Sequence, residues 1–196
     1  MKTQNSNFTS VWSNAILLAT LFALSSCGKE STKEKPAPLT SSNVKAPDID
    51  IHTAVVSGNL EALKQHIVAG TDLNEKDPFG GSSPLISAAV FGKTEEARLL
   101  IDAGADLNFQ NNEGSTPLHT SAFFCRPEIV KMLLDKGAGK NIKNKFGATP
   151  RETVMGSFSD AKSIYDMMGQ MLAPMGLKLD YVYIQKTRPV IADMLK

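Results

Sequence analysis

This chain of 196 residues has few cysteines and histidines and almost no net charge. Its two cysteines, Cys27 and Cys125, lie too far apart in the sequence to indicate a disulfide framework or a zinc site. The formal net charge of +1 gives the chain no electrostatic reason to bind nucleic acid or an anionic membrane surface. The composition, 42% hydrophobic and 21% charged, is instead typical of a soluble protein with a real core.

Patterns that support catalysis are also missing. The three histidines, His52, His66 and His119, stand at no spacing from cysteines or carboxylates that is typical of a metal site. No glycine-rich phosphate loop follows a strand-like run. Cys125 follows His119 closely, but a nucleophilic thiolate needs an activating environment that nothing in the sequence demonstrates. We therefore expect no catalytic residue, metal, cofactor or small-molecule substrate, and keep an enzyme only as an outlying alternative.

The longest apolar run, residues 15–24, predicts an export signal. Ten residues span about 15 Å as a helix, roughly half of a bilayer core, so the run is too short for a good membrane span. Its length is that of the hydrophobic region of a secretory signal. The following Leu24-Ser25-Ser26-Cys27 resembles the bacterial lipobox, which implies cleavage before Cys27 and lipidation of its thiol. An ordinary cleaved signal, with Cys27 lost or inert, is the alternative.

The lipoprotein resemblance implies an envelope location. Residues 1–27 form the signal peptide and lipobox, and several acyl chains on Cys27 give durable anchoring. Gly28 stands where lipoproteins kept in the inner membrane often carry Asp, which favours the outer membrane, facing the periplasm, in a diderm bacterium. Residues 28–47 are polar and contain three prolines, so we expect a disordered linker with a reach of about 25 Å.

The rest of the chain repeats with a period of 33 residues. Three series keep this step or come within a residue or two of it. The series are Pro84, Pro117 and Pro150; Gly81, Gly114 and Gly147; and Asn74, Asn108 and Asn141. A proline in the first turn of a helix loses no needed hydrogen bond, and a preceding Ser or Thr can cap that helix. Each period therefore predicts a turn followed by a helix.

Residues 114–122, Gly-Ser-Thr-Pro-Leu-His-Thr-Ser-Ala, resemble the hallmark of the ankyrin repeat. The resemblance implies an all-α solenoid of about four helix-turn-helix repeats with a helical C-terminal cap. It also implies that His52 and His119, at equivalent positions, hydrogen-bond within the loops. The expected repeats cover residues 48–77, 78–110, 111–143 and 144–173, and a C-terminal extension covers 174–196.

The two ends of the array are less regular than its middle. The first repeat lacks the Thr-Pro-Leu motif, as expected of a capping repeat. In the fourth, a long second helix is expected to end at Pro174. Residues 181–184 predict a short strand or an apolar loop, and a helix is expected from Thr187 onward. We expect this tail to dock on the last repeat; a separate partner-binding element is the alternative.

The ankyrin resemblance implies a protein partner on the concave surface built by finger tips and first helices. A C-terminal segment that filled this surface would remove that role. The alternative function is a structural or stress-protective envelope lipoprotein without a dedicated partner. Phe91 and Phe124 could instead tuck between repeats or under the tail. The expected partner-binding residues are Phe79, Val90, Phe91, Asn112, Glu113, Phe123, Phe124, Lys145 and Phe146.

Overall fold

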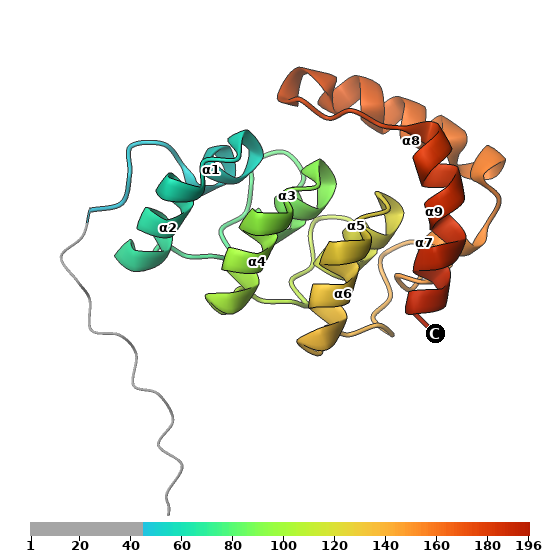
Figure 1. The fold of residues 1–196 in the computed structure, drawn as a ribbon, viewed down its shortest axis with the longest axis horizontal. Coiled ribbons are helices and arrows are strands. Elements are labelled where there is room, and N and C mark those ends of the chain that lie inside the picture. The colour runs from blue at the N-terminus through green and yellow to red at the C-terminus, as the bar shows by residue number, and fades with distance from the viewer. Residues whose placement is uncertain (1–44) are drawn as a thin grey trace, which may run out of the picture. The chain divides into compact units, whose positions relative to one another are not determined.

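The computed structural model describes residues 45–196, and every regular element in this part is a helix (Figure 1). The signal peptide, Cys27 and the linker as far as residue 44 lie outside the described residues. None of the described helices is long and apolar enough to cross a membrane. The helices are α1 Ile51–Ser57, α2 Leu60–Ala69, α3 Pro84–Phe91, α4 Thr94–Asp102, α5 Pro117–Phe123, α6 Pro127–Asp135, α7 Glu152–Met155, α8 Phe158–Leu172, the 3-10 turn η1 Ala173–Met175, and α9 Tyr181–Met194.

The first helices of the second and third repeats begin where the capping residues predict. The side chain of Thr116 accepts from the backbone N–H of His119, with Pro117 in the first turn of α5. Ser83 and Pro84 start α3 in the same way. The contacts that define the start of α3 and of α5 are therefore local in sequence.

The first three helix pairs stack side by side, as Figure 1 shows. The inner helices α1, α3 and α5 contact one another, and so do the outer helices α2, α4 and α6. Small residues such as Ala88 and Ala122 are fully buried in the inner row, which allows close approach of the helices. Leu100 and Leu133 fill the same place in α4 and α6, and Leu63 lies one turn earlier in α2; none of the three has exposed surface. One continuous hydrophobic core therefore runs through the stack.

The fourth pair is built differently from the expectation. The short helix α7 packs on α5 as an inner helix should, but the outer position beside α6 and α7 is taken by α9. Ile191 and Leu195, at 0% and 3% exposure, join the main core there. Helix α8 and the strap that follows it, defined here as residues 176–180, are thus inserted within the fourth helix pair.

The expected strand or loop at residues 181–184 is therefore wrong. This segment is the first turn of α9, which starts where Asp180 accepts from the backbone N–H of Tyr183. Its alternating pattern looked strand-like, yet Ile184 and Ile191, seven residues apart, lie on one buried face of the helix. Pro189, expected near a helix start, lies inside α9.

Candidate protein-binding surface

The finger edge, defined as the loop tips 77–82, 111–115 and 144–148, is held rigid by side chains that bind the backbone. The carboxylate of Asp77 accepts from the backbone N–H groups of Phe79, Gly80 and Ser82 at 2.7–2.8 Å. Burial acts to raise the pKa of Asp77, but these hydrogen bonds outweigh it and the pKa is lowered. Asn111 and Asn144 play the same part in the next two tips.

Neighbouring tips are joined into a row by backbone hydrogen bonds. The N–H of Asn112 donates to the carbonyl of Gly80, and the N–H of Lys145 donates to the carbonyl of Glu113, both at 2.9 Å. Gly114, with φ of 73°, allows the close approach, because a Cβ there would lie 3.0 Å from the backbone nitrogen of Lys145. The three tips consequently act as one surface rather than as separate loops.

Five of the nine expected partner-binding residues lie together on this row. Phe79 is 89% exposed and Phe146 79% exposed, at the first and third tips. The exposed side chains of Asn112, Glu113 and Lys145 lie on the second and third tips. The row thus presents two large apolar side chains with polar and charged groups among them.

The expected residues at the ends of the inner helices are more enclosed. Val90 and Phe91 are half-buried at the end of α3. The ring of Phe123 stacks on that of Tyr165 from α8, with centroids 4.4 Å apart. Phe124 is only 3% exposed, so the expectation that it lies on an open surface is wrong. Its ring lies edge-on against that of Phe123, with centroids 5.2 Å apart, and Phe123 is the residue that Tyr165 of α8 covers.

Comparison with known proteins identifies the repeating part of the chain. A family model for ankyrin repeats, in three copies, matches residues 51–144. Residues 51–144 have the ankyrin-repeat fold. The crystal structure of the ankyrin repeat domain of Bcl-3, a member of the IkappaB family, aligns with a TM-score of 0.51 and 30% sequence identity over 53% of this chain and 45% of that one. The all-α ankyrin fold predicted from the sequence is confirmed.

Curated relatives share the ankyrin part only. Human protein phosphatase 1 regulatory subunit 27 is 41% identical over 64 residues, 33% of this chain and 41% of that protein. Mouse protein phosphatase 1 regulatory subunit 12A is 39% identical over 72 residues, 37% of this chain and 7% of that protein. The human DNA-binding protein RFXANK is 40% identical over 58 residues, 30% of this chain and 22% of that protein. Subunits and repeats of this kind point to a module that contacts other proteins.

The histidines serve the ankyrin framework. The backbone N–H of Thr116 donates to Nδ1 of His119, and Nε2 of His119 pairs with the carbonyl of Ala148 at 3.0 Å, which places the proton on Nε2. Burial lowers the pKa of His119, while the bond to Ala148 acts to raise it. His52 pairs likewise with the carbonyl of Glu75 at the next finger. His66 is 4% exposed, a more buried position than its sequence environment predicts.

Cys125 has the surroundings of a structural thiol. It lies in the turn between α5 and α6 with φ of 54°, where the earlier repeats have Gly58 and Gly92 in the same left-handed conformation. It has no exposed surface, and burial raises the pKa of its thiol to about 11, although Arg188 and Arg126 act in the opposite direction. A thiol held protonated and out of solvent is a poor nucleophile.

Two arginines that the sequence did not single out hold the turns together. Arg126 donates through Nη2 to the carbonyl of Val90 in the preceding repeat at 3.0 Å. Arg188, 3% exposed on α9, donates to the carbonyl of Gly156 and to the hydroxyl of Tyr165, each at 3.0 Å. Arg126 follows Lys93 by 33 residues, so the repeat period places both in equivalent turns. This spacing was the signal that could have singled out Arg126. Arg188 had none, because its partners come from other helices.

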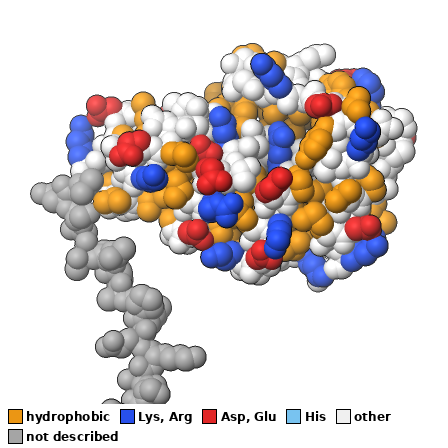
Figure 2. All heavy atoms as spheres, viewed as in Figure 1, with side chains coloured by type: hydrophobic (Ala, Val, Ile, Leu, Met, Phe, Trp, Pro, Cys, Tyr) orange, Lys and Arg blue, Asp and Glu red, His pale blue; other side chains and the backbone are white. Residues whose placement is uncertain are grey.

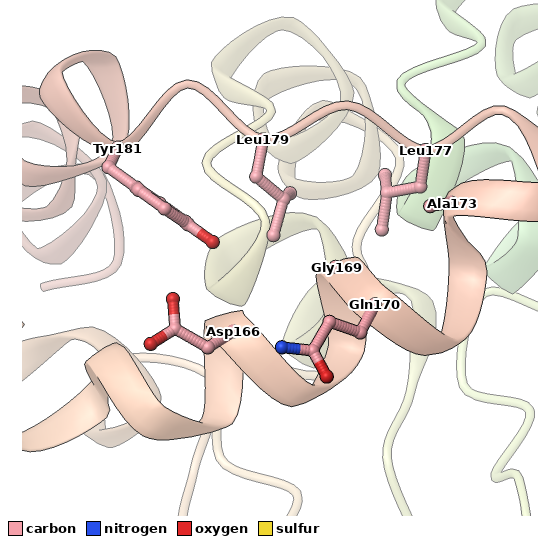
Figure 3. Close-up of a pocket in the computed structure, with 7 residues that line it drawn as sticks. All are labelled: Asp166, Gly169, Gln170, Ala173, Leu177, Leu179 and Tyr181. Atoms are coloured by element: carbon pink, nitrogen blue, oxygen red, sulfur yellow. The ribbon is translucent and has the colours of Figure 1, made fainter.

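The pocket between α8 and the strap is lined by residues that contact one another. Figure 3 shows Tyr181 pointing to Asp166 and Leu179 lying against Gly169. Lys162 pairs with Asp166 at 2.8 Å, and their hydrogen bond is the main cause that lowers the pKa of Asp166. Leu179 thus fastens the strap to α8, and Tyr181 joins the start of α9 to the same helix. Among the described residues no group of His, Cys, Asp and Glu side chains could hold a metal ion.

Charge is mixed on the surface that Figure 2 shows. Acidic and basic side chains are interspersed over this face of the described chain, with apolar side chains between them. A surface of this kind creates no extended field of one sign that would attract nucleic acid. The most exposed aromatic side chains of the described residues, Phe79 and Phe146, lie on the finger edge.

Proposed function

We propose that this protein is a lipid-anchored interaction module that binds one protein of the bacterial envelope through its finger edge. The observation that carries the proposal is the exposure of Phe79 and Phe146 at the tips of a hydrogen-bonded row. Large aromatic side chains that are fixed by a rigid backbone supply much binding energy at a small cost in entropy.

The finger edge also indicates what the partner offers. The partner needs two apolar hollows that accept the rings of Phe79 and Phe146. Between them it needs groups that pair with Glu113 and Lys145. The half-buried Val90 and Phe91 extend the surface toward the inner helices. The α5 end, covered by α8, does not take part. Because two regulatory subunits of a phosphatase are among the relatives, regulation of a partner enzyme is a role that fits.

Photocrosslinking in the source bacterium tests the interaction directly. A photoreactive phenylalanine at position 79 or 146 should capture the same single protein, whereas one at Val190, 54% exposed on α9, should not. Replacing both Phe79 and Phe146 with Ala should weaken that complex by roughly 2 kcal/mol or more without changing the melting temperature, since both rings are exposed. Many unrelated crosslinks, or co-sedimentation with peptidoglycan alone, would support a structural envelope protein instead.

The lipid anchor is proposed from the sequence and supported by the lipobox-like residues 24–27. With Cys27 acylated, the linker 28–47 would tether the ankyrin repeats to the outer membrane on its periplasmic side. Metabolic labelling with a clickable fatty acid should mark the chain and not its Cys27→Ser variant. Equal labelling of the two proteins would contradict this anchor. So would the absence of label from a Cys125→Ala variant.

A further inference from the structure

The hydrogen bonds that join neighbouring finger tips repeat along the array, and the pattern is open at its last member. The carbonyls of Gly80 and Glu113 each accept from a backbone N–H of the next tip at 2.9 Å. Phe146 follows them at the same step of 33 residues, and its carbonyl accepts no hydrogen bond from the described part of the chain. The third tip therefore ends the row as an unpaired backbone edge.

A series of asparagine side chains shows the same open end. Oδ1 of Asn74 accepts from the backbone N–H of Asp106, and Oδ1 of Asn108 accepts from that of Gly139, both at 2.8 Å. Asn141 is the third member of the series, and its exposed side chain has no hydrogen-bond partner among the described residues. The last finger thus offers an amide oxygen and a carbonyl where earlier fingers bind a neighbouring backbone.

The end face, defined here as residues 140–151, is also the basic part of the array. It contains no carboxylate, and its four cations are Lys140, Lys143, Lys145 and Arg151. The equivalent stretches of the earlier repeats, 74–85 and 107–118, each have one more acidic than basic side chain. The ammonium groups of Lys143 and Lys145 form no salt bridge or hydrogen bond within the described residues. Charge complementarity therefore favours an acidic occupant.

An open hollow lies beside these acceptors. Its lining includes Asn141 and Arg151 together with the apolar side chains of Met155 and Leu195. Met155 is 55% exposed, so it is available to a neighbour. Side chains of an extended segment alternate between two sides. Such a segment can therefore place carboxylates toward the lysines and apolar groups toward Met155.

We propose that the end face binds an extended acidic segment of a partner protein, which continues the row as an added finger. Backbone N–H groups of the segment donate to the carbonyl of Phe146 and to Oδ1 of Asn141, and its carboxylates pair with Lys143 and Lys145. A phosphate group meets the lysines but has no row of N–H donors for the two acceptors. The inference goes beyond the proposed function, because it uses neither phenyl ring of the finger edge.

A second copy of this chain is a poorer occupant than a foreign segment. To continue the row, its first tip would have to supply the N–H of Phe79, which is equivalent to the donors of Asn112 and Lys145. That N–H already donates to the carboxylate of Asp77 at 2.8 Å. The row is thus closed at its first tip and open only at its last.

Selection from a displayed library of short random peptides tests the end face. The full chain is presented in mild detergent, beside a variant with Asn141→Ala and Lys143→Glu, which are both exposed positions. We expect peptides rich in Asp and Glu that are enriched on the natural chain and lost on the variant. Lys64→Glu, an exposed change of equal charge on α2, is the control and should retain them. Peptides without acidic residues, or equal enrichment on all three proteins, would overturn the proposal.

Titration of the strongest selected peptide into the ¹⁵N-labelled chain then locates its binding site. Amide signals of residues 140–148 should shift, while those of the first tip, 77–82, should stay in place. Lys143→Glu alone should weaken binding about fivefold or more, and added salt should weaken it further. Replacing single peptide amides with esters should reveal positions where the loss of an N–H lowers the affinity.

Three results would contradict the acidic segment. Equal shifts with inorganic phosphate or with phosphatidylglycerol vesicles would indicate a simple anion site. Shifts that depend on protein concentration alone would assign the end face to a second copy, and an ester scan without effect would exclude the backbone bonds. The variant with Phe79→Ala and Phe146→Ala should bind the peptide as the natural chain does. Failure of the finger edge and failure of the end face can therefore be told apart.

Discussion

At the scale of single residues, His119 combines a structural role with sensitivity to pH. Its Nδ1 accepts from the N–H of Thr116, and its Nε2–H donates to the carbonyl of Ala148 in the next finger. Protonation of Nδ1 breaks the first of these bonds and places a charge in a site with 1% exposure. The neutral form therefore belongs to the folded state, and burial lowers its pKa below 6.5 accordingly.

The lowered pKa predicts how His119 couples stability to pH. The unfolded chain takes up the proton near pH 6.5, before the folded chain does, so acid favours unfolding. The stabilisation that neutral His119 supplies is fully present above the pKa of His119 in the unfolded chain. It is lost as the pH falls from there to the pKa of His119 in the folded chain. The free energy of unfolding can be measured with urea at about pH 7.5 and about pH 5. It should fall less between these two pH values for His119→Gln than for the natural chain. Equal losses in the two proteins would assign the acid sensitivity to other groups.

At the scale of elements, the two C-terminal helices depend on one buried cation. Arg188 on α9 donates to the carbonyl of Gly156 behind α7 and to the hydroxyl of Tyr165 on α8. The hydroxyl of Tyr165 in turn donates to the carbonyl of Phe123 on α5 at 2.6 Å. Burial raises the pKa of Tyr165 to about 12, so the phenol keeps this proton. A chain of hydrogen bonds thus joins α9, α8 and α5.

Replacing Arg188 with Met should loosen α8 before it affects the repeats. The carbonyl of Gly156 and the hydroxyl of Tyr165 would lose their partner in a buried place, at a cost on the order of 2 kcal/mol. Hydrogen exchange followed by mass spectrometry should show faster exchange in α8 and α7, with α1 to α4 unchanged. Lys186→Met, an exposed change on the same helix, is the control. Uniform acceleration through all repeats would refute this local role.

At the scale of the whole described molecule, the fourth unit is discontinuous in sequence. Helix α9 completes the stack beside α6 and α7, while α8 and the strap form an insertion between α7 and α9. Stability in such arrays is a sum of repeats and the interfaces between neighbours. The loss of α9 removes a helix of the stack itself, whereas the loss of α8 removes the packing of Tyr165 on the end of α5 and its hydrogen bond to Arg188.

This difference predicts the outcome of two deletions. Replacing residues 158–179 with a Gly-Ser linker of about six residues should leave a folded stack with a single unfolding transition. Deleting 181–196 should lower the melting temperature more, because the buried side chains of Ile191 and Leu195 leave the core. Circular dichroism during heating measures both variants. A larger loss from the first deletion would show that α8, rather than α9, completes the array.

The ankyrin fold was predictable because its information is local. Thr116, Pro117 and their counterparts specify where helices begin, and they recur every 33 residues. The exposure of Phe79 and Phe146 was also predictable, since a tight finger tip leaves a side chain little to pack against. The sequence left open whether Phe124 is exposed or buried, and it could not show that Phe123 stacks on Tyr165, because Tyr165 lies 42 residues later in the chain.

The sequence by itself determined the starts of α3 and α5, the repeat period and the row of finger tips, since each depends on residues within one repeat. Only the tertiary structure decided that α9 takes the outer position of the fourth pair and that α8 lies over α5. Both outcomes depend on which distant surfaces lose most water when they meet. The buried contacts of Arg188 with α7 and α8 belong to the same class, because its acceptors become neighbours only after the chain has folded.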